Sequence, residues 1–130
     1  MPNVVFFSFT EADRDTVLTI KGRAVNSNYY NLNFRVQDLL KRWDTEDVAT
    51  IRQAISKKMK GTSRTIVFVG NQTASSRWVK EEVEMTLANG KHVYAIRLKD
   101  SYGSTPKVLS DNSIYLHSWS EDKLQELATK

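Results

Sequence analysis

The feature that most constrains the fold is one continuous segment, residues 61–84, in which an apolar strand pattern leads through a polar loop into a helix pattern. Residues 65–69 form a β-branched and aromatic run without polar alternation, which is typical of a strand buried on both faces of a parallel sheet. Residues 70–76 are polar, and the helix pattern opens with Trp78. Because open α/β sheets bind ligands at the carboxyl ends of their strands, we expect a functional site where this strand ends.

The alternation of strand and helix patterns continues along the whole chain. Strands are predicted at residues 4–9, 32–36, 64–70, 92–98 and 113–116. Helices are predicted at residues 16–25, along the face formed by Val48, Ile51, Ile55 and Met59, after the loop 70–76, and around Leu124 and Leu127. Such alternation predicts a parallel sheet covered by helices on both faces. The two most apolar strands, 4–9 and 64–70, belong in its centre, which gives the flavodoxin-like order 2-1-3-4-5 in a three-layer α/β sandwich and a single domain over residues 1–130.

Several residues are expected to begin or end these elements. Asp13 or Asp15 is predicted to cap the first helix, Asp44 or Thr45 the second, and Ser118 with Glu121 the last, while Gly61 and the pair Asn89-Gly90 are predicted to end helices. Residues 26–31, 38–44 and 99–112 are expected to be loops or irregular segments.

The composition narrows the class of protein. With 40% hydrophobic and 26% charged residues, the sequence is that of an ordinary globular domain. There is no cysteine, no apolar run long enough for a membrane span and no export signal, so we expect a cytoplasmic location. The net charge of +4 is mild, and the lysines of residues 57–60 suit the last turn of a helix better than a nucleic-acid surface. We therefore expect neither a membrane nor a nucleic acid as partner.

Several familiar sites are missing from the sequence. The third predicted strand ends in Gly70-Asn71, so it lacks the phosphoacceptor aspartate of a receiver domain. Neither G-x-G-x-x-G nor G-x-x-x-x-G-K-[ST] occurs, which excludes the standard dinucleotide and P-loop motifs. His92 and His117 have no second ligand at metal spacing, so no metal site is expected.

One constellation can carry chemistry. Trp78 and Glu82 are spaced i, i+4 and share a helix face, with Ser75 and Ser76 just before them. Free N–H groups at the start of that helix suit a phosphate. Across the switch point of the sheet, the first strand supplies the segment 8–10. An aromatic ring, a carboxylate and an anion-binding helix end can hold a nucleotide. On spacing alone, however, the structural interpretation is favoured, in which Trp78 packs on the sheet and Glu82 is one acid on a solvated face.

The sequence also resembles a known family. FFSF near the start, GTSRTIVFVG in the middle and ASSRWVKEEV directly after it resemble the TIR (Toll/interleukin receptor) domain, and more narrowly the small ThsB-like TIR proteins of bacterial Thoeris antiphage defence. The match covers nearly the whole chain, although residues 24–39 depart from the usual TIR pattern. By this resemblance Glu82 is the catalytic residue, and the substrate-binding residues are Ser8, Phe9, Thr10, Asp38, Ser75 and Trp78.

The family implies cleavage of the nicotinamide–ribose bond of NAD⁺, with NAD⁺ as substrate and no cofactor. It further implies self-association through the TIR domain and a cyclic or otherwise modified ADP-ribose that activates a separate effector protein. Two alternatives remain open at this stage: a non-catalytic TIR-like interaction module, and a flavodoxin-like domain that binds a different nucleotide.

Overall fold

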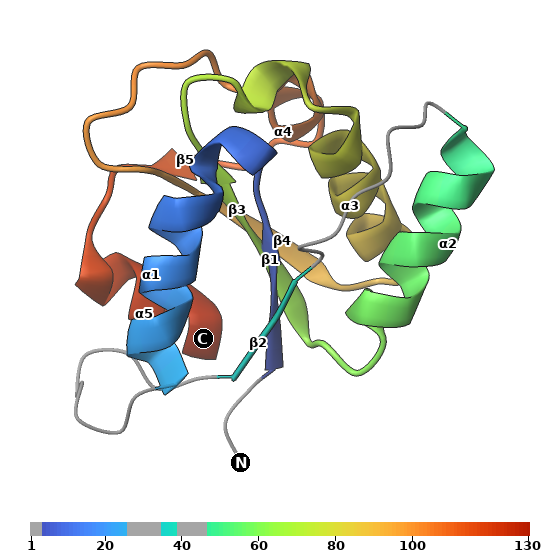
Figure 1. Cartoon of the computed structure of the whole chain (residues 1–130), viewed down its shortest axis with the longest axis horizontal. Coiled ribbons are helices and arrows are strands. Elements are labelled where there is room, and N and C mark those ends of the chain that lie inside the picture. The colour runs from blue at the N-terminus through green and yellow to red at the C-terminus, as the bar shows by residue number, and fades with distance from the viewer. Residues whose placement is uncertain (1–3, 26–34, 39–46) are drawn as a thin grey trace.

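The computed structural model describes residues 4–25, 35–38 and 47–130. Five parallel strands form one sheet in the order β2-β1-β3-β4-β5, and helices cover both of its faces (Figure 1). The strands are β1 (Val4–Ser8), β2 (Arg35–Asp38), β3 (Arg64–Val69), β4 (His92–Arg97) and β5 (Leu116–His117). The helices are α1 (Arg14–Val25), α2 (Val48–Met59), α3 (Arg77–Ala88), α4 (Lys107–Asp111) and α5 (Glu121–Thr129), with short 3-10 turns η1 (Glu11–Asp13) and η2 (Thr73–Ser75). The predicted fold class and strand order are confirmed.

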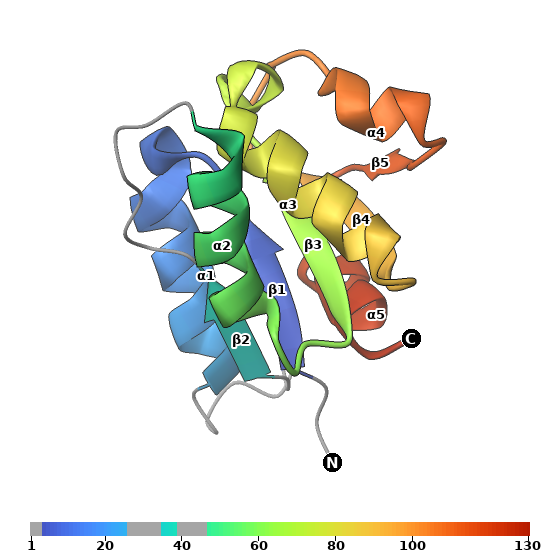
Figure 2. The same ribbon diagram turned by 90° about the vertical axis from the view of Figure 1, so that its right-hand side faces the viewer.

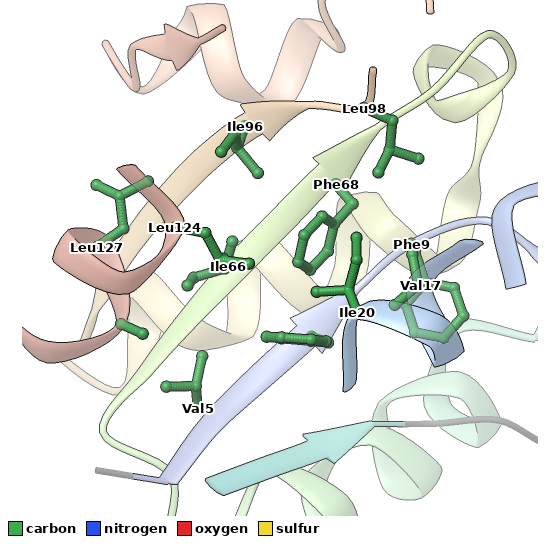
Figure 3. Close-up of a cluster of buried hydrophobic side chains, with 12 residues drawn as sticks. Val5, Phe9, Val17, Ile20, Ile66, Phe68, Ile96, Leu98, Leu124 and Leu127 are labelled. Atoms are coloured by element: carbon green, nitrogen blue, oxygen red, sulfur yellow. The ribbon is translucent and has the colours of Figure 1, made fainter. Parts of the chain in front are cut away.

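One face of the sheet packs against α1 and α5. Side chains that alternate along the strands, such as Phe7 and Phe68, meet there with ring centroids 4.6 Å apart in an edge-to-face arrangement. Figure 3 shows this cluster between the sheet and the two helices. Its buried members are Val5, Phe7, Phe9, Val17, Ile20, Ile66, Phe68, Ile96, Leu98, Leu124, Leu127 and Ala128. Full burial of both strand faces explains why β1 and β3 read as continuous apolar runs.

The opposite face packs against α2, α3 and α4. Figure 2 shows α2 and α3 in front of the strands on this face. Phe6 of β1 joins Ile51, Ile55 and Met59 of α2 in one cluster. A second cluster joins the strand residues Val67, Val69, Val93 and Ala95 to Val79, Val83, Val108 and Leu109 of α3 and α4. Since side chains alternate along a strand, Ser8 shares this face with Phe6.

Helix boundaries differ from the predictions in two places. The N-cap of α2 is Asp47, whose side chain accepts from the backbone N–H of Thr50, and not Asp44 or Thr45. The N-cap of α5 is Ser120, which accepts from the N–H of Lys123, so the predicted capping box at Ser118 is wrong. In each case a residue of the same chemistry a few positions later makes the cap.

The boundaries of several predicted loops and strands also differ in the structure. Residues 99–112 contain α4, because Val108 and Leu109 are buried against α3 and tie this turn to the core. The last strand is Leu116–His117 instead of 113–116, and β2 extends through Asp38, which was predicted to be irregular. The predicted loop 26–31 and the start of the predicted strand 32–36 lie outside the described residues. The predicted helix ends at Gly61 and Gly90 are confirmed: both glycines adopt positive φ just after α2 and α3.

None of the helices in the described part of the chain combines the length and the apolar character needed to span a bilayer.

Two loops meet at the carboxyl edge of the sheet. The N–H of Tyr102 donates to Oδ1 of Asn71 at 2.7 Å, and Nη1 of Arg97 donates to the carbonyl of Gly103 at 2.7 Å. Gly103 itself lies so close to the other loop that a Cβ there would be 2.8 Å from Cα of Asn71. The loop after β4 is thus held against the loop after β3, next to the start of α3.

We predict that Gly103→Ala and Gly22→Ala change stability in opposite directions. The new Cβ at Gly103 meets backbone, which cannot move aside cheaply, so unfolding should become easier by about 1–3 kcal/mol. Gly22 lies in α1 with nothing within 4 Å of the added Cβ, so alanine should stabilise the helix by about 0.5–1 kcal/mol. Urea denaturation of both variants measures the two changes; a Gly103→Ala protein as stable as the wild type would contradict the close packing of the two loops.

Candidate active site

Ser8 and Glu82 meet in the interior of the protein. Oγ of Ser8 donates to Oε1 of Glu82 at 2.8 Å, and both residues have a relative exposure of 0%. Ser8 is the last residue of β1, and Glu82 lies in the second turn of α3. The structure therefore brings together the predicted catalytic residue and one of the predicted first-strand residues, at the switch point between β1 and β3.

Helix α3 is anchored at its start and along its buried face. The side chain of Ser76 accepts from the N–H of Val79 and caps the helix. One turn beyond Glu82, Oγ1 of Thr86 donates to the Glu82 carbonyl at 2.7 Å and lies 2.6 Å from Oγ1 of Thr65 on β3. The backbone that carries Glu82 is thus tied to the central strand, which limits how far its carboxylate can shift relative to the sheet.

Trp78 packs toward α2. It is half-buried and contacts the cluster formed by Phe6 of β1 and the apolar residues of α2. The i, i+4 face of Trp78 and Glu82 thus lies between α2 and the end of β1. Trp78 therefore packs as a structural residue, as spacing alone suggested, and also lies on the same helix face as the Glu82 carboxylate.

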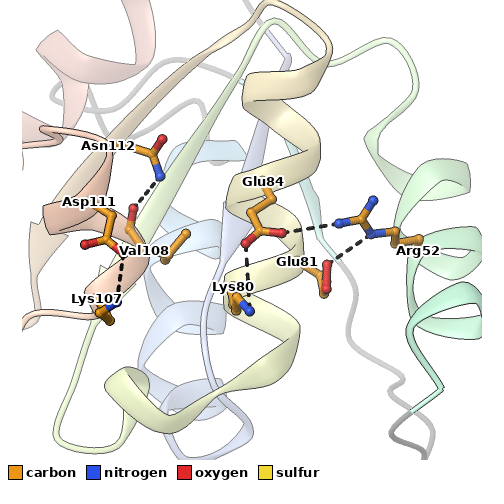
Figure 4. Close-up of polar contacts among 8 residues, drawn as sticks. All are labelled: Arg52, Lys80, Glu81, Glu84, Lys107, Val108, Asp111 and Asn112. Carbon is orange, nitrogen blue, oxygen red and sulfur yellow. Dashed lines mark hydrogen bonds and ion pairs between the residues drawn. The ribbon is translucent and has the colours of Figure 1, made fainter.

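A polar contact joins α2 to α3 beside this face. Arg52 donates from Nε to Glu81 at 3.1 Å and from Nη2 to Glu84 at 3.2 Å, and Lys80 lies 3.9 Å from Glu84 (Figure 4). Glu81 is only 4% exposed. Of the three acids, only Glu84 keeps substantial exposure, so the interpretation of Glu82 as one acid on a solvated face is wrong.

The other two first-strand residues lie in different surroundings. Phe9 is 1% exposed and belongs to the cluster against α1 and α5, so its side chain faces away from Glu82. Thr10 is 8% exposed, and its Oγ1 donates to Oδ2 of Asp13 at 3.0 Å. The Asp13 carboxylate in turn lies against Gly70, where a Cβ would collide with it.

Ser75 lies on the other side of α3 from Trp78. It lines a polar groove of about 690 Å³ between the start of α3 and α4, and its hydroxyl donates to the carbonyl of Gln72. Ser8, Trp78 and Glu82 are absent from the lining of this groove. Asp38 ends β2 and pairs with Phe7, and its side chain lies outside the described part of the structure.

Sequence reasoning missed the residues that shape the edge of the sheet. Asp13, Arg97 and Gly103 support the loops around the strand ends, and Thr65 with Thr86 anchors α3. The spacing Thr10-x-x-Asp13 was a readable signal for a local turn, but the contacts of Arg97 and Gly103 depend on the tertiary fold. Within residues 4–25, 35–38 and 47–130, no group of three or more His, Asp or Glu side chains is placed to hold a metal ion.

Comparison with known proteins identifies the family of the chain. Residues 6–102 match the family model described as Thoeris protein ThsB, TIR-like domain. The chain belongs to this family. The matched segment contains the last three residues of β1 and all of β3 and α3, and therefore both Ser8 and Glu82.

Two similar proteins place the match in context. The chain is 33% identical over 63 residues to a Bacillus cereus (strain MSX-D12) protein named "Putative cyclic ADP-D-ribose synthase ThsB1", covering 46% of this chain and 32% of that relative. The match thus spans about a third of the relative's length. The TIR domain of the Toll-related receptor TRR-2 from Hydra magnipapillata has a similar fold, with a TM-score of 0.57 and 17% identity over 95% of this chain and 90% of that one.

We predict that Arg52→Ala destabilises the contact between α2 and α3. Loss of the guanidinium removes the cation beside the buried Glu81 carboxylate, which should lower the free energy of unfolding by about 1–3 kcal/mol. The matched control is Lys107→Ala, because Lys107 pairs with Asp111 at 3.4 Å on an exposed surface and should cost less than about 0.5 kcal/mol. Equal effects of the two substitutions in thermal denaturation would contradict this account of Arg52.

Proposed function

We propose that this protein cleaves the nicotinamide–ribose bond of NAD⁺ and that Glu82 is its catalytic carboxylate. The observation that carries the proposal is the buried position of Glu82 at the end of β1, within a chain that belongs to the ThsB TIR-like family. A buried carboxylate at the switch point of an α/β sheet is unusual for a structural residue, because burial penalises its charge.

One carboxylate is sufficient for this reaction. Ordinary glycoside hydrolysis uses a second carboxyl group to protonate the leaving oxygen. In NAD⁺ the leaving nitrogen already carries positive charge, so the bond electrons depart with neutral nicotinamide and no general acid is needed. The remaining ribose has oxocarbenium character, which a nearby carboxylate stabilises.

The attacking group determines the product. Water adds to the ribose carbon and loses a proton to give ADP-ribose, whereas a nucleophile within the same ADP-ribose gives a cyclic product when water is excluded. The name of the Bacillus cereus relative favours the cyclic product. In this proposal the product is a diffusible signal in the cytoplasm that activates a separate effector protein, and self-association through the TIR domain assembles the active form.

The other residues proposed to bind the substrate differ in how close they lie to Glu82. Trp78 lies on the helix face of Glu82 and Thr10 follows Ser8, so both are near the proposed reaction centre. Phe9 can contribute only its backbone, because its side chain is in the opposite core. Ser75 can reach a substrate only if the nucleotide extends around the start of α3 toward the α4 side.

We predict that Glu82→Gln strongly slows NAD⁺ cleavage. Removing the charge should slow nicotinamide release by on the order of a hundredfold or more, since a preorganised charge at the reacting centre is lost. Glu84→Gln is the matched control, because Glu84 lies two residues further on the same helix and is partly exposed, and it should retain wild-type activity.

The measurement is incubation of concentrated protein with NAD⁺, followed by chromatography and mass spectrometry of nicotinamide and its co-product. The co-product mass distinguishes hydrolysis from cyclisation. Undiminished nicotinamide release by Glu82→Gln would refute the proposal. If the wild type binds partners but never cleaves NAD⁺, alone or in extracts of phage-infected cells, the protein is an interaction module instead.

A further inference from the structure

The contact between Ser8 and Glu82 links two distant parts of the chain. The residues are 74 positions apart in sequence, yet the hydroxyl of one strand end and the carboxylate of one helix turn meet at 2.8 Å without solvent exposure. A serine hydroxyl has a single proton to donate. Because Ser8 donates that proton to Glu82, it can act toward a substrate only as a hydrogen-bond acceptor.

We propose that Ser8 is a positioning residue, whose hydroxyl holds the Glu82 carboxylate ionised and in one orientation at the end of β1. This inference rests on the proposed function of Glu82 and gives Ser8 a role different from direct substrate binding. Catalytic charge is effective when its orientation is set before the reaction begins.

The surroundings of Glu82 make this donor important. Burial disfavours a charged carboxylate, and a hydrogen bond to the charged form opposes that effect. The strand residues around Ser8 on this face, Phe6 and the paired Val67, are apolar and offer no replacement donor from their side chains. Thr86 binds the backbone carbonyl of Glu82, so it fixes the helix turn but not the carboxylate.

Charged side chains on the elements packed against α3 are either exposed or bound to other groups. Strand β1 has no titratable residue, and the exposed Lys57, Lys58 and His92 lie on α2 and β4. The remaining charged side chains contact other groups. On α2 and α4, Arg52 binds Glu81 and Glu84, Lys107 pairs with Asp111, and Asp47 caps α2. On the strands, Arg97 binds the carbonyl of Gly103, and Arg64 binds the carbonyls of Leu127 and Lys130. The Ser8 hydroxyl, by contrast, reaches Oε1 of the Glu82 carboxylate at 2.8 Å.

The test is an NMR titration of side-chain carboxyl carbons in ¹³C-labelled protein, with the Glu82 signal assigned by its loss in Glu82→Gln. In Ser8→Ala the pKa of Glu82 should rise by about one to two units, because a hydrogen bond to the charged form is lost. Ser8→Cys keeps the shape with a weaker donor and should give a smaller rise. Thr62→Val is the control, since it removes a buried hydroxyl that donates to the carbonyl of Met59 and should leave the pKa of Glu82 unchanged.

Kinetics provide a second readout. In Ser8→Ala, kcat should fall roughly tenfold to a hundredfold with a smaller change in KM, and the acidic limb of the pH profile should move to higher pH. An unchanged pKa of Glu82 in Ser8→Ala would overturn the proposal, and if that variant does not fold, the same criterion applies to Ser8→Cys. Absence of NAD⁺ cleavage by the wild type would refute the proposed function, while the titration would still decide whether Ser8 holds the carboxylate.

Discussion

The parallel pairing of β1 with β3 is the constraint on which the rest of the structure depends. It aligns Ser8 with Val67 and brings the carboxyl ends of both strands to the same edge of the sheet. Because the chain crosses from β3 into α3 at that edge, the second turn of the helix returns to the end of β1 and places Glu82 beside Ser8. The cores on both faces keep this pairing in place, since each strand contributes alternate side chains to each of them.

The burial of the Glu82 carboxylate determines which contacts it needs and how a substrate could reach it. Removing a carboxylate from water is costly unless it receives hydrogen bonds, and Glu82 receives one from Ser8. Neighbouring Glu81 is nearly as buried and is compensated by Arg52 of α2, so two adjacent acids on α3 are stabilised from two different elements. With Glu82 at 0% exposure, the proposed reaction requires the protein to open so that a ribose can reach the carboxylate. Such an opening provides a physical basis for activity that depends on assembly or on a signal.

Periodic and strongly apolar segments could be predicted from the sequence, and contacts made only by the tertiary fold could not. The strand around Phe68, the helix face of Ile51 and Ile55, and the sheet order follow from patterns that both local preference and burial support. Helix α4 was missed because its two buried residues, Val108 and Leu109, are adjacent and show no helical period. The proximity of Glu82 to the end of β1 could be predicted from the sequence. That the Phe9 side chain faces the opposite core could not, because it depends on which side of the strand each residue occupies.

The central claim is that the reaction takes place at Glu82, at the end of β1. Its most direct test is a crystal structure of the protein with an NAD⁺ analogue in which carbon replaces the oxygen of the nicotinamide ribose ring, so that the bond is not cleaved. We predict that the hydroxyls of that ribose lie within hydrogen-bond distance of the Glu82 carboxylate. An analogue bound in the groove between α3 and α4, or anywhere else with its ribose away from Glu82, would contradict the account.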